Sequence, residues 1–425
     1  MYNIIDFGAV ADGKTLVTEA IQKAIDECNK NGGGRVVIPT GNFYTGSIFL
    51  KDNVELHLEH GAVLTASANI DDYNADDAYQ QNYGYAPEEW RAKHLIMAIE
   101  CKNVAITGTG TIDGNGDSYR AEPTLSPENS GYGWRFGTAH VKDIEIMRPG
   151  QLICFVESSE IVVDGLTIRN APCWSVFLHG CEFVRVSRLN IFNGKTALNT
   201  DGIDIDCCRF VTVSDCNIET GDDAITFRCA SQRLKIPKVC EYITVTNCNL
   251  AVSASAFRVG VGFGRIRHVR VSNITVLRAG SGIHFMTSYC GHGEAFIEDV
   301  NFSGVSMYDT GWPIRIEGDR AYIKNVTLEN IRAYSLANSK IVPDKPGIVS
   351  DVTIRGVDLF MQKDERDLKP HQIKARGEHM LYITNVDGLT LDSVRIIADD
   401  SVVSLWTSKF KAQDCDNLIT KDCKY

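Results

Sequence analysis

Two short stretches, Glu182-Phe183-Val184-Arg185-Val186 and Arg209-Phe210-Val211-Thr212-Val213, show the pattern that decides the fold. In both, a polar corner leads into alternating β-branched residues, and Asn, Asp or Gly turn residues follow, as expected of a short half-buried strand. This cassette occurs at least nine times in the chain. Its other copies lie at residues 102–106, 159–163, 241–245, 266–271, 297–302, 323–328, 349–354 and 386–391.

The spacing of these cassettes indicates a repeat architecture. From residue 159 onward they start roughly 23 to 37 residues apart, which is in the range of solenoid proteins. No amphipathic helix pattern separates them, so a parallel β-helix fits better than a leucine-rich or helical solenoid. Adjacent rungs of such a helix stack about 4.8 Å apart. We therefore expect an all-β chain in which residues 1–425 form a single β-helix domain.

One helix is predicted, at about residues 17–29. A glycine run at residues 32–34 ends it. Because a bare solenoid end exposes unpaired strand edges and the apolar interior, we expect this short N-terminal helix to cap the first rung. The residues that form its apolar face are Ala20, Ile21, Ala24, Ile25 and Cys28.

Two insertions, at about residues 71–93 and 115–140, interrupt the repeat and are rich in aromatic residues. These rings either provide stacking platforms for sugars or only pin the loops to the wall of the β-helix, and the sequence leaves both interpretations open. The aromatic residues are Tyr79, Tyr83, Tyr85, Trp90, Tyr119, Tyr132 and Trp134.

Charge and hydropathy limit the partners of the chain. Its formal net charge is −11, with acidic and basic residues interspersed, so neither nucleic acid nor an anionic membrane is an expected partner. We see no apolar run of about 18 residues and no basic-then-apolar leader before Met1, and we expect a protein that is not exported. No surface pattern identifies an oligomer interface, so the oligomeric state is left open.

The 14 cysteines are scattered through strand-like segments without the paired spacing of a zinc site. A secreted chain could use them as a disulfide framework, but buried free thiols in a reducing compartment fit this distribution better. We therefore expect a cytoplasmic protein, with no metal ion and no cofactor.

The most informative residues are three acids in two motifs, Asn199-Thr200-Asp201-Gly202 and Gly221-Asp222-Asp223. Asp201 and Asp222 are 21 positions apart, close to one turn of a compact coil, so we expect them at equivalent places on neighbouring rungs. Clustered carboxylates repel one another and raise one another's pKa, so their assembly has little structural benefit and suggests a function.

Glycoside hydrolysis requires such an arrangement, since one protonated carboxyl donates to the leaving oxygen and one carboxylate acts on water or on the sugar. A calcium site is the second functional interpretation, because stacked acids also suit oxygen-loving cations. For Asp206 or Asp215 alone, a structural role at a turn is the better interpretation.

Over nearly its whole length the sequence resembles family 28 glycoside hydrolases, the polygalacturonase group. The last two of the matching segments, at their spacing, are specific to that family. These segments are Asp6-Phe7-Gly8-Ala9-Val10-Ala11-Asp12-Gly13, Gly108-Thr109-Gly110-Thr111-Ile112-Asp113-Gly114, Arg148-Pro149, Pro172-Cys173-Trp174, Asn199-Thr200-Asp201-Gly202 and Gly221-Asp222-Asp223.

The resemblance implies a right-handed, single-stranded parallel β-helix and an inverting hydrolase acting on an oligosaccharide. It implies that Asp222 is the general acid. Asp201 and Asp223 would together position and deprotonate the attacking water.

The sequence departs from the family at two basic segments. Where the resemblance predicts Gly-His-Gly, Ala254 takes the place of the histidine. Where it predicts Arg-Ile-Lys, His284 and Met286 take the places of the arginine and the lysine. In the family these basic residues hold a galacturonate carboxylate, which Met286 cannot do. Either a neutral or unusual sugar occupies the cleavage subsite, or other basic residues bind the carboxylate.

Six residues are candidates for binding the substrate. Arg228 and Arg258 are the arginines that could replace the missing basic residues. His284 occupies a position that contacts substrate in the family. The others, by their position near the acid motifs or on a glycine loop, are His179, Asn199 and His292.

The sequence thus favours an exo-acting glycosidase that trims pectin-related or other plant oligosaccharides, with the two insertions closing one end of the cleft. A lyase or sugar-transferring enzyme on the same β-helix is one alternative, and insensitivity to a chelator together with the absence of an unsaturated product would argue against the lyase. A non-catalytic carbohydrate-binding solenoid is another. The loss of the two basic segments favours it slightly, but the presence of all three acids disfavours it more.

Overall fold

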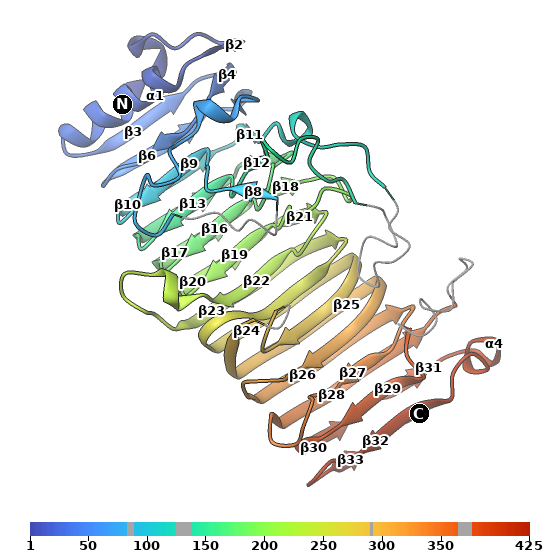
Figure 1. The fold of residues 1–425 in the computed structure, drawn as a ribbon. Coiled ribbons are helices and arrows are strands. Elements are labelled where there is room, and N and C mark those ends of the chain that lie inside the picture. Colours follow the sequence, from blue (N-terminus) through green and yellow to red (C-terminus); the bar gives the residue numbers. More distant parts are fainter. Residues whose placement is uncertain (83–88, 125–137, 290–291, 364–375) are drawn as a thin grey trace. The chain divides into compact units, whose positions relative to one another are not determined.

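The computed structural model describes residues 1–82, 89–124, 138–289, 292–363 and 376–425. The chain divides into two compact units. The first contains Met1–Thr124, Gly137–Asp222 and Arg233–Pro237, and the second contains Asp223–Gln232 and Lys238–Tyr425. Both units consist mainly of parallel β-strands (Figure 1).

The first unit begins with short elements around one long helix. These are β1 (Tyr2–Asn3), η1 (Ile4–Phe7), β2 (Asp12–Leu16), α1 (Thr18–Lys30), β3 (Gly34–Ile38), β4 (Gly41–Thr45), β5 (Ile48–Phe49), β6 (Val54–Leu58), β7 (Ala62–Ala66) and η2 (Ile70–Asp72). Its next elements are β8 (Trp90–Arg91), β9 (Ile96–Ile99), β10 (Lys102–Gly108), β11 (Thr111–Asp113), η4 (Gly116–Ser118) and β12 (Arg148–Pro149). Three full coils follow, made of β13 (Ile153–Val156), β14 (Ser159–Asp164), β15 (Thr167–Arg169), β16 (Val176–His179), β17 (Glu182–Ser187), β18 (Asn190–Phe192), β19 (Ile203–Asp206), β20 (Arg209–Ser214) and β21 (Asn217–Thr220).

The coils of the first unit stack in parallel register. Strand β17 pairs with β14 on one side and with β20 on the other, so Ile161, Val184 and Val211 form one column. Each of these side chains is at most 1% exposed. The alternation of apolar and polar residues in the cassette therefore places every second side chain in the interior, and the predicted parallel β-helix is confirmed.

Each cassette begins with a backbone corner. In the earlier copies the second residue has a left-handed conformation, with φ of 57° at Glu160 and 56° at both Phe183 and Phe210, and in the copies that start at residues 266, 297, 323 and 349 the third residue has it. Such values are uncommon for residues other than glycine, and this corner turns the chain into the next strand. Phe183 and Phe210 stack on the outside of consecutive coils with ring centroids 5.0 Å apart. The regular recurrence of this corner explains why the sequence repeat is readable.

Helix α1 lies at the end of the first unit beside β3 (Figure 1). The helix buries the face that the sequence predicts. That face consists of Ala20, Ile21, Ala24, Ile25 and Cys28, each less than 9% exposed. Just after the helix, Gly33 has φ of 104°, and a side chain there would overlap the backbone of Asn53. The predicted N-terminal capping helix is thus confirmed, together with the glycine run that ends it.

The second unit contains longer strands that bend through the corners. Its elements are β22 (Ile225–Cys229), β23 (Cys240–Val252), β24 (Ser255–Met286), β25 (Glu294–Glu317), β26 (Ile323–Ser335), β27 (Ser339–Ile341), β28 (Val349–Met361), β29 (His379–Thr384), β30 (Val386–Asp392), β31 (Arg395–Ile397), α4 (Asp400–Val403), β32 (Ser408–Gln413) and β33 (Ile419–Lys421). One interior column contains Val269, Val300, Val326, Val352 and Leu389, in parallel register from strand to strand. The 3-10 helix η5 (Ser231–Arg233) lies between β22 and β23 in the sequence.

The predicted insertions lie partly outside the described residues, and so do Tyr83, Tyr85, Tyr132 and Trp134. Within the described part, Tyr119 is 6% exposed and its hydroxyl donates to the carbonyl of Ser67 at 3.0 Å, so this ring pins its loop. Tyr79 and Trp90 instead line a cavity. The structural interpretation therefore holds for Tyr119, and stacking of Tyr79 or Trp90 on a sugar stays a prediction.

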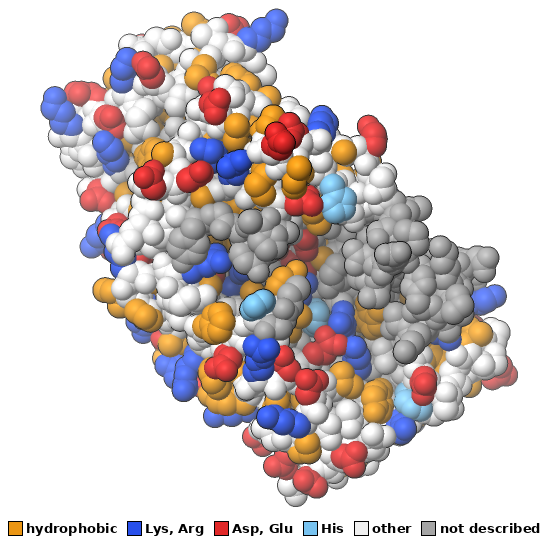
Figure 2. All heavy atoms as spheres, viewed as in Figure 1, with side chains coloured by type: hydrophobic (Ala, Val, Ile, Leu, Met, Phe, Trp, Pro, Cys, Tyr) orange, Lys and Arg blue, Asp and Glu red, His pale blue; other side chains and the backbone are white. Residues whose placement is uncertain are grey.

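Three general features follow from the described residues. All cysteines among them are free thiols, and most of these are buried. No helix in this part of the chain is long and apolar enough to cross a membrane. On the face shown in Figure 2, acidic and basic side chains lie interspersed.

Candidate active site

Asp201 lies on the turn that leads into β19 and is 5% exposed. Two neighbouring coils fix this turn. The amide of Ser175 donates to the carbonyl of Asp201 at 2.8 Å. The hydroxyl of Thr200 donates to the carbonyl of Ala197 at 2.8 Å and accepts from the amide of Gly221 at 3.1 Å. The turn is thus tied to the coil before it and to the coil after it.

The glycine of the Gly221-Asp222-Asp223 motif is needed for close approach. A side chain at Gly221 would overlap the carbonyl oxygen of Ala197. Without that side chain, the turn of Asp222 packs against the turn of Asp201, and carboxylate oxygens of the two acids lie within 4.8 Å of each other. The predicted proximity of these two acids on neighbouring rungs is confirmed. Asp223 follows Asp222 directly in the chain.

A buried arginine supports the first acid motif. Arg148, on β12, is 1% exposed. Its guanidinium donates to the side-chain oxygen of Asn199 at 2.6 Å and to the carbonyl of Leu198 at 2.5 Å. A third hydrogen bond, to the carbonyl of Pro172, is 2.8 Å long. Asn199, which the sequence suggests as a substrate contact, therefore has a structural partner here, and Arg148 orients the residues just before Asp201.

In the second unit, Asp223 is held by Arg258. The arginine donates to both carboxylate oxygens, through Nε and, at 3.1 Å, through Nη2. The amide of Ser255 adds a hydrogen bond of 2.7 Å. The side chains of Asp223 and Arg258 are 5% and 7% exposed. A bidentate arginine pair gives a carboxylate a fixed orientation and a full set of donors.

His284 continues this network as a neutral ring. Its Nδ1 accepts from Nη1 of Arg258 at 3.4 Å, and its Nε2 donates to Glu317 at 3.1 Å. Burial lowers the pKa of His284 to about 3, and the charge of Arg315 adds to that effect. Burial alone would raise the pKa of Glu317, but the hydrogen bond from His284 and the charges of Arg315 and Lys340 outweigh it and lower this pKa.

The structure explains the residue that takes the place of the expected lysine. The sulfur of Met286 accepts a contact from Nη1 of Arg258 at 3.2 Å. A lysine at this position would place an ammonium group against the guanidinium, and the two like charges would repel. Met286 therefore belongs to the environment that allows Arg258 to pair with Asp223.

Two more basic residues of the second unit follow His284 on the next strands of the sheet. Parallel register places His284 next to Arg315, and Arg315 next to Lys340. Arg315 contacts Glu317 at 2.8 Å and Lys340 contacts the same carboxylate at 2.5 Å. Glu317 thus collects hydrogen bonds and charges from three coils.

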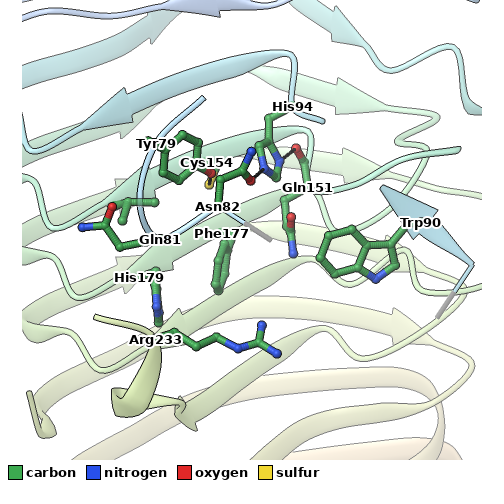
Figure 3. Close-up of a pocket in the computed structure, with 11 residues that line it drawn as sticks. Tyr79, Gln81, Asn82, Trp90, His94, Gln151, Cys154, Phe177, His179 and Arg233 are labelled. Carbon is green, nitrogen blue, oxygen red and sulfur yellow. Dashed lines mark hydrogen bonds between the residues drawn. The ribbon is translucent and has the colours of Figure 1, made fainter. Parts of the chain in front are cut away.

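The remaining predicted residues lie in different surroundings. Arg228 is a half-buried residue of β22. His292 is exposed, and its backbone pairs with that of Tyr289. His179 lies on β16 in the first unit, is 3% exposed and lines a cavity (Figure 3). The structure therefore brings Arg258 and His284 together. Arg228 lies on β22, which pairs with the strand of Arg258, and a substrate contact of Arg228, His179 or His292 stays a prediction.

Several residues of these networks are not recognised from the sequence as site residues. Arg148 hydrogen-bonds Asn199, and Glu317 hydrogen-bonds His284. In both pairs the two residues lie far apart in the sequence. Gln81 and Arg233 line the cavity beside His179. The register between rungs is the sequence signal that could identify such residues, because Arg315 on the next coil pairs with His284.

The acid cluster also has the composition of a cation site. Asp201, Asp222 and Asp223 each offer a carboxylate oxygen. Oxygen ligands of this kind suit calcium or magnesium. The same residues thus allow two chemistries, proton transfer and cation binding, which a chelator distinguishes.

Replacing His284 by Gln should flatten the dependence of stability on pH. The folded protein keeps this ring neutral down to a pKa of about 3, whereas the unfolded chain takes up a proton near its ordinary value of 6.5. As pH falls through this window, the free energy of unfolding should decrease by up to about 1.4 kcal/mol per pH unit. Urea unfolding at pH 7, 6, 5 and 4 measures the slope. An equal slope in wild type and His284→Gln would contradict this role.

Comparisons with known proteins agree with the fold and the motifs. The model of glycosyl hydrolases family 28 matches residues 28–369, and the chain belongs to this family of O-glycosyl hydrolases. A probable polygalacturonase of Vitis vinifera is 30% identical over 328 residues, which cover 75% of this chain and 62% of the relative. An exo-poly-alpha-D-galacturonosidase of Dickeya chrysanthemi is 32% identical over 255 residues, covering 53% of this chain and 41% of that protein. The chain thus spans less than two thirds of both relatives.

Solved structures give the same architecture. The family 28 exopolygalacturonase of Yersinia enterocolitica has a TM-score of 0.71 and 20% identity, over 98% of this chain and 78% of the other. The exopolygalacturonase of Thermotoga maritima has a TM-score of 0.68 and 20% identity, over 93% and 91%. At this identity the likeness establishes the fold, which is the right-handed parallel β-helix.

Proposed function

We propose that this protein is an inverting glycoside hydrolase that acts from the end of pectin-related oligosaccharides. One observation supports it most strongly: Asp201 and Asp222 lie within 4.8 Å of each other on turns that neighbouring coils fix. Relatives named exo-poly-alpha-D-galacturonosidase and exopolygalacturonase favour action from the chain end and a pectic substrate.

The three acids divide the work. Asp222 donates its proton to the glycosidic oxygen as the bond to the leaving sugar breaks. Asp201 and Asp223 accept hydrogen bonds from a water molecule and remove its proton as the oxygen attacks the anomeric carbon. Arg258 and the amide of Ser255 fix the orientation of Asp223 for that task. No cofactor takes part in these steps.

The spacing of the carboxylates bears on the stereochemistry. Carboxyl groups roughly 5–5.5 Å apart are typical of retaining enzymes, and roughly 6.5–9.5 Å of inverting ones. The 4.8 Å within which Asp201 and Asp222 lie joins single carboxylate oxygens, so it assigns the pair to neither group. We favour inversion because the third carboxylate, Asp223, has its own arginine and can hold water, and because the family resemblance assigns the same roles.

The sugar at the cleavage subsite is a separate question. Met286 and neutral His284 give no free cation at the positions where the resemblance predicts a carboxylate clamp, and the charge of Arg258 is used by Asp223. We therefore propose a sugar without a carboxylate at the subsite that these residues line.

A cytoplasmic location is likewise a proposal, which cell fractionation tests.

Product analysis tests the proposed function. The purified protein should release a saturated sugar from at least one member of a panel of pectic and neutral plant oligosaccharides. Removal of divalent cations with EDTA should leave the rate within about twofold, since proton transfer by carboxyl groups needs no metal. Loss of activity with EDTA, restored by calcium, would favour the cation site, and an unsaturated product would indicate a lyase. Binding of several panel members without cleavage would indicate a carbohydrate-binding solenoid.

A further inference from the structure

Glu317, at the end of β25 in the second unit, is connected to Asp223 by a continuous series of side-chain hydrogen bonds. The two side chains between them are Arg258 and His284. The mechanism proposed above uses Asp223 and Arg258 but gives Glu317 no task. The contacts along this series show what Glu317 does at its far end.

The contacts of His284 fix the position of its ring proton. A guanidinium group has no acceptor atom, so Nδ1 of His284 must accept from Nη1 of Arg258, at 3.4 Å. Burial lowers the pKa of His284 to about 3, so the ring is neutral and carries one proton. That proton therefore lies on Nε2, which donates to Oε2 of Glu317 at 3.1 Å. The carboxylate of Glu317 thus selects the tautomer of His284 that can accept from Arg258.

Glu317 is itself held in place by two cations. Nη2 of Arg315 donates to Oε2 at 2.8 Å, and Nζ of Lys340 lies 2.5 Å from Oε1. Burial alone would raise the pKa of Glu317, but the hydrogen bond from His284 and the two positive charges lower it overall. Glu317 is therefore ionised and acts only as a hydrogen-bond acceptor.

At the other end of the series, Arg258 orients Asp223. Its Nε and Nη2 donate to the two carboxylate oxygens, while its Nη1 contacts His284 and the sulfur of Met286. A guanidinium group is planar and rigid, so contacts that fix Nη1 also fix the two nitrogens that face Asp223. A change at Glu317 therefore reaches Asp223 through the orientation of Arg258.

Charge balance does not explain the contact between Glu317 and His284. Asp223 already neutralises Arg258, and the ring of His284 is neutral. Arg315 is the residue in register with His284, but it offers only donors. Glu317 supplies the acceptor that Nε2 requires, so the contact serves the orientation of the ring.

We propose that Glu317 is a positioning residue for hydrolysis, which sets the tautomer of His284 and so holds Arg258 in the orientation that presents Asp223 to the attacking water. This network occupies the positions where the resemblance predicts the basic clamp. The inference rests on the proposed function and adds to it a residue that acts through two other side chains.

Substitution of Glu317 by Leu tests the proposal by removing the acceptor. The variant should lose about 10- to 100-fold in kcat, because small displacements of a reacting group have effects of this size. Its KM should stay within about twofold of wild type, since the walls of the site are unchanged. Glu317→Gln still offers an oxygen to Nε2 and should keep kcat within about threefold. Initial rates on the best substrate of the oligosaccharide panel measure both variants.

The matched control is Glu298→Leu, on the same strand. The side chain of Glu298 is 19% exposed, against 27% for Glu317, and it pairs with Lys324 at 3.1 Å. Both Leu variants should lower the unfolding temperature to a similar extent, but Glu298→Leu should keep kcat within about twofold. Equal losses of kcat in the two variants, or none in Glu317→Leu, would leave Glu317 a structural role only and overturn the proposal.

NMR of the histidine ring nitrogens tests the tautomer without relying on activity. In protein labelled with ¹⁵N-histidine, the signals of His284 are those missing from His284→Gln. They should show the proton on Nε2 in wild type and a mixture of tautomers in Glu317→Leu. A proton on Nδ1 in wild type, or an unchanged ring in Glu317→Leu, would overturn the proposal. A wild type that cleaves no member of the panel would instead count against the proposed function, and the spectra would still decide whether Glu317 sets the tautomer.

Discussion

Replacing Asp222 by Asn should lower kcat by about 10²–10⁴-fold, the usual contribution of a general acid. The amide has nearly the same size as the carboxyl group, but it cannot supply the proton that the leaving oxygen needs. KM should change little, because the substitution leaves the walls of the site in place. Initial rates on the best substrate of the oligosaccharide panel measure the effect.

The matched control is Asp215→Asn. Asp215 is an exposed residue with φ of 58°, on the corner before β21, and Asn tolerates this conformation as well as Asp does. The same chemical change at this turn should leave kcat within about twofold of wild type. Equal rates for Asp222→Asn and wild type would remove Asp222 from the mechanism.

The second large effect is expected for Arg258→Met. This change leaves the buried carboxylate of Asp223 without its guanidinium partner. Removing one member of a buried ion pair commonly costs about 3–5 kcal/mol in the free energy of unfolding. Activity should fall as well, since Asp223 loses two of the donors that orient it. Urea unfolding monitored by tryptophan fluorescence measures the stability.

A double variant separates the charge from the packing. Arg258→Met combined with Asp223→Asn removes both members of the pair, and the double variant should regain a large part of the lost stability while remaining inactive. A double variant as unstable as the sum of the two single variants would mean that Arg258 acts through packing alone.

Most of the fold could be predicted because it is local and repeated. Each cassette specifies its own strand through the alternation of residues such as Val184 and Val186, and each copy repeats the same corner. The capping helix was equally readable, since its apolar face and its glycine stop lie within one stretch. Corners at residues such as Phe183 are less obvious, because an aromatic residue rarely adopts a positive φ.

The site was only partly predictable. Asp201 and Asp222 could be paired because one coil separates them in sequence. The network of Arg258, His284 and Glu317 depends on the exact register of three coils whose lengths differ, and no periodicity sets those lengths. For the same reason the sequence showed that a basic clamp is missing but could not show that Met286 contacts Arg258.

The cavity beside His179 was the least predictable part. It needs side chains from an inserted loop, such as Gln81, to meet strand residues and Arg233 from far along the chain. Loops of this kind follow no repeat, so the sequence identified aromatic residues there without deciding which of them line a cavity. Tyr79 does so, whereas Tyr119 is fixed to the backbone of Ser67.

The central claim is that Asp222, Asp201 and Asp223 together hydrolyse a glycosidic bond by direct attack of water. Proton NMR during cleavage of the best panel substrate follows the anomeric signal of the sugar as it is released, before mutarotation. Direct attack predicts that the first signal has the configuration opposite to that of the cleaved bond, and that Asp222→Asn shows no such signal on the same timescale. Release with retained configuration would contradict this account, because it would mean that one of the acids forms a covalent intermediate with the sugar.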